Sequence, residues 1–122
     1  MASSKYITKS SGEKAVFESG MQRDINTGKP RFDLLVPSGI PFDEQLLTRF
    51  ANLMTRGAVK YGDRNWENSN GEAELNRFKE SAFRHFMQWF CDERDEDHAA
   101  AILFNIMGYE TTLHKLWKNQ EK

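Results

Sequence analysis

Cysteine is almost absent from the sequence, which has one such residue in 122, and no long apolar segment is present. With Cys91 alone, an intramolecular disulfide is excluded and a cysteine-rich zinc site is not expected. Because Cys91 lies among aromatic residues, we expect it to be a small buried hydrophobic residue. No apolar run is long enough to span a bilayer, and Met1–Ser11 lacks the apolar stretch of a secretory signal. These absences predict a cytoplasmic protein that does not contact a membrane.

An excess of charge of either sign is also lacking, since 17 Lys and Arg residues stand against 18 Asp and Glu residues. Such a balance provides no general attraction to nucleic acid, so we do not expect nucleic acid as the partner. Hydrophobic residues make up 39% of the chain and aromatic residues 12%, which is typical of a folded protein. The length fits one domain of ordinary size.

Proline is confined to the first third of the chain, at positions 30, 37 and 41. This part shows no sustained hydrophobic periodicity, and four glycines interrupt it further. We therefore predict an extended N-terminal arm with turns over residues 1–41. Within it, Arg31–Val36 is expected to form a short strand or a strip that docks on the rest of the protein.

Three helices are predicted over residues 42–122, because apolar residues recur there at helical spacing. The first begins near Pro41 or Asp43, with Asp43 as N-cap, and ends near Gly62 in a left-handed conformation. The second covers about Glu72–Asp92, and the third about Asp95–Trp117. Short connections between helices favour an antiparallel bundle, so the predicted fold class is all-α.

Apolar residues also lie off the main stripes of the second and third helices, at Phe83, Phe90, Leu103, Phe104 and Met107. So much apolar surface on a short chain predicts a homo-oligomer. The alternative is that the N-terminal arm covers this surface.

Polar residues in the second helix form the first candidate site. Glu80 and Arg84 are four residues apart, so an intrahelical salt bridge is the ordinary interpretation. His85 differs because it lies on the apolar stripe, where an interior imidazole needs a partner. It is either a hydrogen-bonded core histidine or a ligand.

An acidic cluster precedes the third helix and ends in an imidazole: Glu93, Asp95, Glu96, Asp97 and His98. Mg²⁺ prefers oxygen ligands and keeps several waters, so two or three carboxylates suffice to hold it. The alternative is a solvated acidic helix start, which suits the helix dipole.

One buried amide is predicted in the third helix, since Asn105 lies in the otherwise apolar stretch Ala99–Met107 and must find partners there. If the second and third helices form an antiparallel hairpin, Arg84 and His85 lie level with Ala101–Asn105. A polar seam would then line one groove, from Glu80, Arg84, His85, Asp97, His98 and Asn105.

The connection after the first helix carries the third candidate site, in the segment 57–66 with sequence GAVKYGDRNW. Lys60 and Arg64 are suited to phosphate, Tyr61 and Trp66 to stacking on a base, and Asn65 to a base edge. The alternative is a helix terminus at which cations offset the dipole and Trp66 fills the core. Two cations of the arm, Lys29 and Arg31, are weaker candidates for further phosphate contacts.

These segments resemble the phage-encoded dATP/dGTP diphosphohydrolases. Residues 28–35 (GKPRFDLL) look like the opening motif of that family, and residues 57–66 resemble its most distinctive signature. Arg84-His85 with Trp89, then Glu93, the acidic turn, His98 and Asn105, complete the likeness. The resemblance covers about Phe17 to Glu110.

The resemblance implies an all-α fold akin to MazG-type nucleotide pyrophosphohydrolases. It also implies cleavage of a purine deoxynucleoside triphosphate to monophosphate and pyrophosphate with Mg²⁺, or Mn²⁺ in its place. The catalytic candidates are Glu80, His85, Glu93 and Asp97. The metal-ligand candidates are Glu80, Glu93, Glu96, Asp97 and His98. The nucleotide-binding candidates are Lys29, Arg31, Lys60, Tyr61, Arg64, Asn65, Trp66, Arg84 and Asn105.

One departure from the MazG pattern leaves a second function open. That pattern has two Glu-x-x-Glu/Asp pairs on successive helices. Glu93 and Glu96 match one pair, whereas Glu80 is followed three residues later by Phe83. A protein that binds and sequesters a nucleotide or a nucleotide-derived signal without turnover is therefore the alternative. The sequence leaves the base, the sugar and the number of subunits open.

Overall fold

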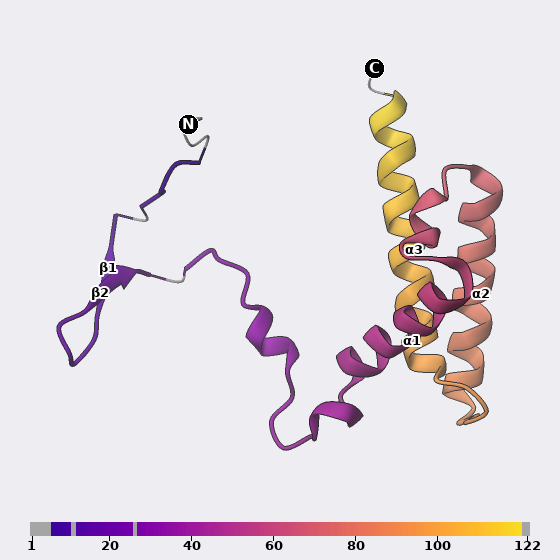
Figure 1. The fold of residues 1–122 in the computed structure, drawn as a ribbon, viewed down its shortest axis with the longest axis horizontal. Helices are drawn as coiled ribbons and strands as arrows, with labels where there is room; N and C mark the ends of the chain where they lie inside the picture. Colours follow the sequence, from indigo (N-terminus) through magenta and orange to yellow (C-terminus); the bar gives the residue numbers. More distant parts are fainter. Residues whose placement is uncertain (1–5, 11, 26, 121–122) are drawn as a thin grey trace. The chain divides into compact units, whose positions relative to one another are not determined.

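The computed structural model describes residues 6–10, 12–25 and 27–120, and the chain divides into two compact units, Met1–Asp33 and Leu34–Lys122. The second unit holds three long helices, so the predicted all-α class and helical bundle are confirmed (Figure 1). The predicted division into an arm, 1–41, and a helical domain, 42–122, stays a prediction.

The first unit contains a small antiparallel hairpin that we did not predict. Strands β1 (Lys14–Val16) and β2 (Gln22–Asp24) pair with Ala15 opposite Arg23. Gly20 in the turn has a φ of +89°, which favours glycine. Strands of three residues offer too little alternation to be detected as a pattern.

Helix α1 (Leu46–Tyr61) begins later than predicted. Residues Phe42–Glu44 form a separate 3₁₀ turn, so Gln45 precedes the helix and the prediction of Asp43 as N-cap is wrong. Gly62 ends the helix as predicted, but the predicted left-handed conformation is wrong. Its φ of +95° and ψ of 155° are instead an extended positive-φ conformation that glycine adopts most readily. Of the two alternatives predicted for Arg31–Val36, the strand is wrong, because Phe32–Leu35 forms a 3₁₀ turn.

Helices α2 (Glu72–Phe90) and α3 (His98–Gln120) form an antiparallel hairpin, and α1 packs mainly on α3 (Figure 1). The third helix begins at His98 rather than at Asp95. Asp97 occupies the N-cap position, where its Oδ1 accepts the Ala100 N–H at 3.2 Å. The acidic residues before Asp97 thus belong to the turn.

The hairpin register also differs from the prediction. His85 lies against His98, about one turn closer to the connecting loop than the predicted level of Ala101–Asn105. Further along, the rings of Phe78 and Phe104 meet edge to face with centroids 6.0 Å apart. Gly108 allows this approach, because a Cβ there would lie 2.4 Å from the Phe78 ring.

The core of the described chain is small. Its buried hydrophobic residues are Leu75, Ala100 and Ala101. Several large side chains of α2 stay exposed, among them Phe83 and Phe90 at 67% and 68%. Cys91 is exposed as well, at the C-cap of α2, so its predicted burial is wrong. Among the described helices, none is both long and apolar enough to cross a bilayer.

Candidate functional site

The loop that carries Asn65 and Trp66 is hydrogen-bonded to the C-terminal half of α3. It contains a 3₁₀ turn, η3 (Asn65–Asn68), followed by the buried Ser69. Thr112 donates a 2.8 Å hydrogen bond to the Ser69 hydroxyl, and Lys115 donates to the carbonyls of Glu67 and Ser69. Because these partners lie more than forty residues apart in sequence, they fix the loop on the helix hairpin.

A pocket of about 340 Å³ lies beneath this loop. Its apolar walls are the rings of Tyr61, Trp66, Phe78 and Phe104. Its polar lining comes from Asn65, Asn68, Ser69, Glu74 and Arg77. Ligand sites for small molecules usually start near this volume and combine apolar walls with a few polar groups. Three of the residues predicted to bind a nucleotide, Tyr61, Asn65 and Trp66, therefore line one pocket.

A second cluster lies at the end of the bundle where α2 connects to α3. The Nδ1 atoms of His85 and His98 are 2.8 Å apart, and the His98 Nε2 lies 2.8 Å from the Asp95 carboxylate. Arg84 Nη2 lies 3.4 Å from the remaining His85 nitrogen, Nε2. Both imidazoles are buried. The contact with His98 gives His85 the hydrogen-bonding partner that a buried imidazole needs.

The hydrogen-bonding partners determine which ring nitrogen of His85 and of His98 donates and which accepts. An ionised carboxylate can only accept, so the proton between Asp95 and His98 lies on the His98 Nε2. This hydrogen bond is the main cause that lowers the pKa of Asp95. For two neutral rings, His98 then accepts at Nδ1 and His85 donates from Nδ1. Burial lowers the pKa of His85 below its ordinary value, and the charge of Arg84 lowers it further. Neutral His85 thus presents its Nε2 lone pair toward Arg84.

Asp97 points to α1 rather than into the histidine cluster. Its two oxygens accept 2.9 and 3.0 Å hydrogen bonds from Nε and Nη2 of Arg49, a bidentate ion pair. The Arg49 hydrogen bond is the largest cause that lowers the pKa of Asp97. This contact ties α1 to the start of α3 and occupies the carboxylate that we predicted to hold metal.

Carboxylates suited to a hard cation remain on the turn. Glu93, Asp95 and His98 each bring a ligand atom within 4.8 Å of one another, and so do His85, Glu96 and His98. Since both His98 nitrogens are already bonded, the oxygens of Glu93, Asp95 and Glu96 fit Mg²⁺ better than the imidazoles do. Glu93 and Asp95 belong to one set and Glu96 to the other, so the three carboxylates are not gathered into one set of close ligand atoms among the described residues. An ion held by Glu93 and Asp95 would keep waters or phosphate oxygens at its other positions.

Glu80 and Asn105 lie apart from the two sets of close ligand atoms, whereas Arg84 lies at the edge of the histidine cluster. Glu80 is exposed on α2 and belongs to neither set of close ligand atoms. Arg84 bonds to Gln88 at 3.1 Å, and the ion pairs described for the chain do not join it to Glu80. Asn105 is buried and donates to the Ala101 carbonyl of its own helix at 2.8 Å.

Two cations of the 57–66 segment lie near the pocket with partners of their own. Lys60 Nζ lies 5.1 Å from the centroid of the Tyr61 ring, and Arg64 forms a 2.6 Å ion pair with Glu67. Arg64 has a φ of +60°, the left-handed conformation, where the chain turns from Gly62 into η3. The phosphate role predicted for these cations stays a prediction.

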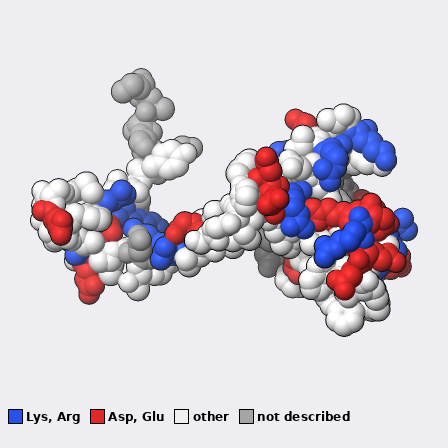
Figure 2. Space-filling model, turned by 90° about the horizontal axis from the view of Figure 1, so that it is seen from below, with Lys and Arg blue, Asp and Glu red and all other residues white. Residues whose placement is uncertain are grey.

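The pocket and the histidine cluster share one face of α2. Arg77 and Phe78 precede Arg84 and His85 by seven residues on this helix, two helical turns or about 10 Å. Figure 2 views the helical unit from below, and acidic and basic side chains lie side by side there.

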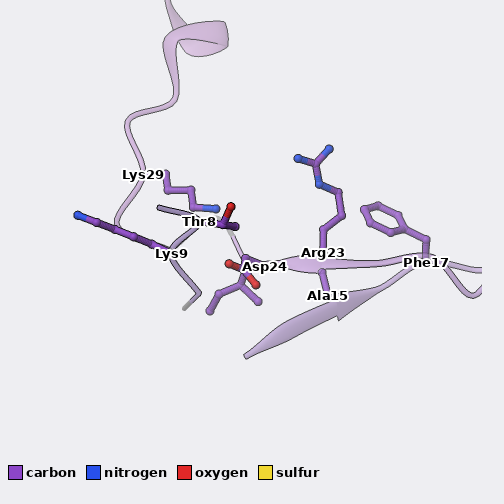
Figure 3. Close-up of a pocket in the computed structure, with 8 residues that line it drawn as sticks. Thr8, Lys9, Ala15, Phe17, Arg23, Asp24 and Lys29 are labelled. Atoms are coloured by element: carbon purple, nitrogen blue, oxygen red, sulfur yellow. The ribbon is translucent and has the colours of Figure 1, made fainter. Parts of the chain in front are cut away.

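The first unit, residues 1–33 with the β1–β2 hairpin, is called here the hairpin unit. It has a concave surface of its own, with a volume of about 630 Å³ (Figure 3). Three cations line it, Lys9, Arg23 and Lys29, together with the Phe17 ring and the Asp24 carboxylate. Lys29, a predicted phosphate contact, thus belongs to this surface. Arg31, the other, is exposed and paired with Asp33 at 2.5 Å.

Sequence reasoning missed several residues of both clusters: Arg49, Glu74, Arg77, Phe78, Phe104 and the bonded role of Asp95. Arg49 gave no signal, because its partner lies 48 residues away. Arg77 gave a weak signal in the sequence, since it lies seven residues before Arg84 and therefore on the same face of the helix. Once the helices pack, such heptad partners line one groove.

The fold and these two clusters define a class: an all-α protein with an aromatic pocket and a charged cluster along one helix hairpin. A family profile described as dATP/dGTP diphosphohydrolase, N-terminal, matches residues 19–121. The chain therefore belongs to this family, and the resemblance seen in its sequence is confirmed. The comparisons found no matching curated protein and no matching solved structure.

Proposed function

We propose that the chain binds a purine deoxynucleoside triphosphate along the α2–α3 seam and hydrolyses it to monophosphate and pyrophosphate with Mg²⁺. The observation that carries the proposal is the alignment of the pocket and the histidine cluster on one face of α2. An aromatic pocket that includes Tyr61 and Trp66 lies about two turns from the cluster around His85. This separation suits an elongated ligand with an aromatic ring at one end and anions at the other.

The pocket end takes the base. Tyr61, Trp66 and Phe104 offer aromatic faces, on which any base gains stacking energy of about 1–3 kcal/mol. Asn65 and Asn68 add amide donors and acceptors for base edges or the sugar.

The cluster end takes the phosphates. Arg84 is exposed, and its guanidinium bonds to Gln88 and lies near His85, two neutral groups. Its charge therefore remains available for phosphate oxygens, which accept well from the planar fork of arginine. Arg49 has no such freedom, because it is paired to Asp97.

Glu93 and Asp95 would hold the metal ion, since each brings an oxygen within 4.8 Å of the other. When bound, Mg²⁺ supplies positive charge that stabilises the phosphate oxygens and favours ionisation of water. In the overall reaction, a water oxygen bonds to the α-phosphorus, the bond from this phosphorus to the bridging oxygen breaks, and pyrophosphate leaves.

The histidine chain receives the proton that water loses. The Nε2 lone pair of His85 becomes available when Arg84 turns to a phosphate. A proton accepted there is stabilised by the bond from His85 to His98, and in turn by the bond from His98 to Asp95. The low pKa of His85, which burial causes, keeps it in the basic form at neutral pH.

One observation favours the second candidate, a protein that binds the nucleotide without turnover. The Asp97 carboxylate is occupied by Arg49 and by the Ala100 N–H, and Glu80 lies outside the sets of close ligand atoms. Fewer free carboxylates than a full MazG-type set would weaken metal binding while leaving the base pocket intact.

An assay of products separates the two candidates. Purified full-length chain is incubated with dATP or dGTP, with and without Mg²⁺, and nucleotides and pyrophosphate are quantified by chromatography. We expect monophosphate and pyrophosphate in equal amounts and only with the metal ion. Glu93→Gln should lower the rate at least about tenfold, the effect typical of a lost metal contact.

The matched control is Glu110→Gln, the same change at an exposed carboxylate of α3 outside both clusters. It should retain the wild-type rate. Recovery of unchanged nucleotide after tight binding would reject hydrolysis and support sequestration. Equal losses in both variants would reject the acidic turn as the metal site.

A second copy of the chain is the partner we propose besides the nucleotide. The outer face of α2 exposes Phe83, Met87 and Phe90, while the described chain buries few large hydrophobic residues. Contiguous apolar surface of this kind usually marks an interface. We place the protein in the cytoplasm, the host cytoplasm if it is phage-encoded, where nucleoside triphosphates are present.

A further inference from the structure

The concave surface of the hairpin unit gathers three cations that have no partner in the described part of the chain. Its lining includes Lys9, Arg23 and Lys29. The ion pairs and hydrogen bonds described there include none of these three side chains. Cations gathered on one concave surface repel each other, so this arrangement is suited to an anion that compensates all three.

The strand register places Arg23 on this surface. Residues opposite each other in an antiparallel pair share one face of the sheet, and Arg23 pairs with Ala15. Figure 3 shows Arg23 and Phe17 projecting from the same side of the β-hairpin, as the alternation of side chains along a strand requires. Because the side chain of Ala15 is small, it leaves room for a ligand beside the Arg23 side chain.

The carboxylate in this lining is already compensated. Asp24 forms a 2.5 Å ion pair with Lys14, the residue opposite it in the register. Lys14 does not belong to the lining. The positive charge of the three lining cations is therefore left for a ligand.

Apolar groups lie among these cations. Ala15, Phe17 and Ile25 line the same surface. Cations beside walls of low dielectric constant attract an anion more strongly than they would in open water. The volume of about 630 Å³ lies in the range of sites for small molecules.

Phosphate groups match this surface better than carboxylates do. A phosphate group carries up to two charges on three acceptor oxygens, whereas a carboxylate carries one charge on two oxygens. Arg23 offers two parallel donors to such oxygens, and Lys9 and Lys29 act as point charges. Cations around one concave surface favour a small ion of linked phosphates over a nucleic-acid strand, whose backbone follows a groove.

We propose that Lys9, Arg23 and Lys29 form a site for a short inorganic polyphosphate, namely pyrophosphate or triphosphate, on the hairpin unit. The inference goes beyond the proposed function, because it concerns an ion without a base. It also concerns residues that the proposed reaction does not use.

Calorimetry of the full chain with inorganic pyrophosphate and with inorganic triphosphate, without divalent metal, tests the site. We expect one ion to bind per chain and triphosphate to bind more tightly, because it carries more charge. Raising NaCl from about 0.05 M to about 0.3 M should weaken binding severalfold, since salt screens charges at an open surface. Failure of the wild type to bind either ion would overturn the inference.

Removal of single cations assigns the binding to residues. Arg23→Met should weaken pyrophosphate binding at least about tenfold, because charge-assisted hydrogen bonds are lost. Lys9 precedes both strands, so Lys9→Met leaves the strand pairing intact and should weaken binding severalfold. NMR backbone shifts of β1 and β2 show whether the β-hairpin persists in each variant. Full affinity in both variants would overturn the inference.

Glutamates introduced at neighbouring positions of β1 provide a matched comparison. Ala15→Glu places a carboxylate opposite Arg23 in the lining, so it should weaken pyrophosphate binding at least about tenfold. Val16→Glu changes the charge of the chain equally at an exposed position on the other face of the β-hairpin. It should keep the affinity to within about threefold, because water screens the added charge. Equal losses in the two variants would contradict a site on the Ala15 face.

Further outcomes separate this site from the proposed nucleotide site. Arg84→Met should still bind one ion per chain, and loss of binding there but not in Arg23→Met would move the ion to the α2–α3 seam and overturn the inference. A thymidine oligonucleotide that binds more tightly than triphosphate and depends on Arg23 would make the ligand a nucleic acid, which would also overturn it.

The proposed function and this inference can fail independently. Hydrolysis of dATP or dGTP by a chain that binds neither inorganic ion would support the enzyme and reject the inference. Binding of both ions, dependent on Arg23, by a chain that neither binds nor hydrolyses these nucleotides would support the inference and reject the enzyme.

Discussion

At the scale of single residues, the contact between Arg49 and Asp97 links the first helix to the start of the last. It combines two charge-assisted hydrogen bonds with an N-cap contact to Ala100, and neither side chain is fully buried. Partly exposed ion pairs contribute less than buried ones, because water screens them. We therefore expect a contribution of about 1 kcal/mol to the free energy of unfolding.

Removal of the cation tests this value and its pH dependence. The pKa of Asp97 in the folded chain lies below its ordinary value of 3.8. The stabilisation is therefore complete above that value and is lost as pH falls through the folded pKa. Urea unfolding of Arg49→Met should show a loss of about 1 kcal/mol at pH 7 and a smaller loss at pH 3.

Arg94→Met provides the control for this experiment, since it removes the same charge from an exposed position of the turn. Its stability should stay close to that of the wild type at both pH values. A loss in Arg49→Met that is as large at pH 3 as at pH 7 would contradict the assignment of the contact to an ionised Asp97.

At the scale of elements, the packing of α2 on α3 depends on a glycine. In an exposed helical position, replacement of glycine by alanine stabilises by up to about 1 kcal/mol. At Gly108 the added Cβ would lie 2.4 Å from the Phe78 ring, which must then move. Because overpacking costs about 1–3 kcal/mol, we expect Gly108→Ala to lower the free energy of unfolding.

The matched control is Gly57→Ala in α1, where no atom lies within 4 Å of the added Cβ. We expect it to leave stability unchanged or to raise it, as urea unfolding would record. Phe78 also lines the pocket, so Gly108→Ala should weaken nucleotide binding as well. If Gly108→Ala stabilises the chain as much as Gly57→Ala, the close approach of the two helices is wrong.

The sequence was sufficient to predict the three long helices and insufficient to predict their register or the short β-hairpin. Periodicity located three helices, and the signature around Tyr61 and Trp66 located the pocket wall. The level of His85 on the hairpin was wrong by about a turn, because the turn residues Glu93–Glu96 were assigned partly to the helix. The pairing of Asp97 with Arg49 depends on how α1 packs on α3, which local patterns do not encode.

At the scale of the whole molecule, the exposed apolar face of α2 predicts self-association. Phe83 and Phe90 are two-thirds exposed. Phe90 also stacks on the ring of Phe86, with centroids 6.3 Å apart. Size-exclusion chromatography with light scattering should therefore give the mass of at least a dimer. Phe83→Glu should reduce the mass to that of one chain, because it would bury a charge in the interface.

The control for that change is Val59→Glu, at an exposed apolar position of α1 outside this face. Its mass should equal that of the wild type. A wild-type protein that is a single chain at the concentrations used in the nucleotide assays would contradict the interface.

The central claim is that one nucleotide spans the aromatic pocket and the charged cluster. A crystal structure of the chain with Mg²⁺ and the α,β-methylene analogue of dGTP tests it most directly, because that analogue is not cleaved at the reacting bond. We predict the base against Tyr61, Trp66 and Phe104, and the phosphates beside Arg84 and the carboxylates of the turn. A nucleotide bound elsewhere, such as on the lysine-lined surface of the hairpin unit, would contradict the account.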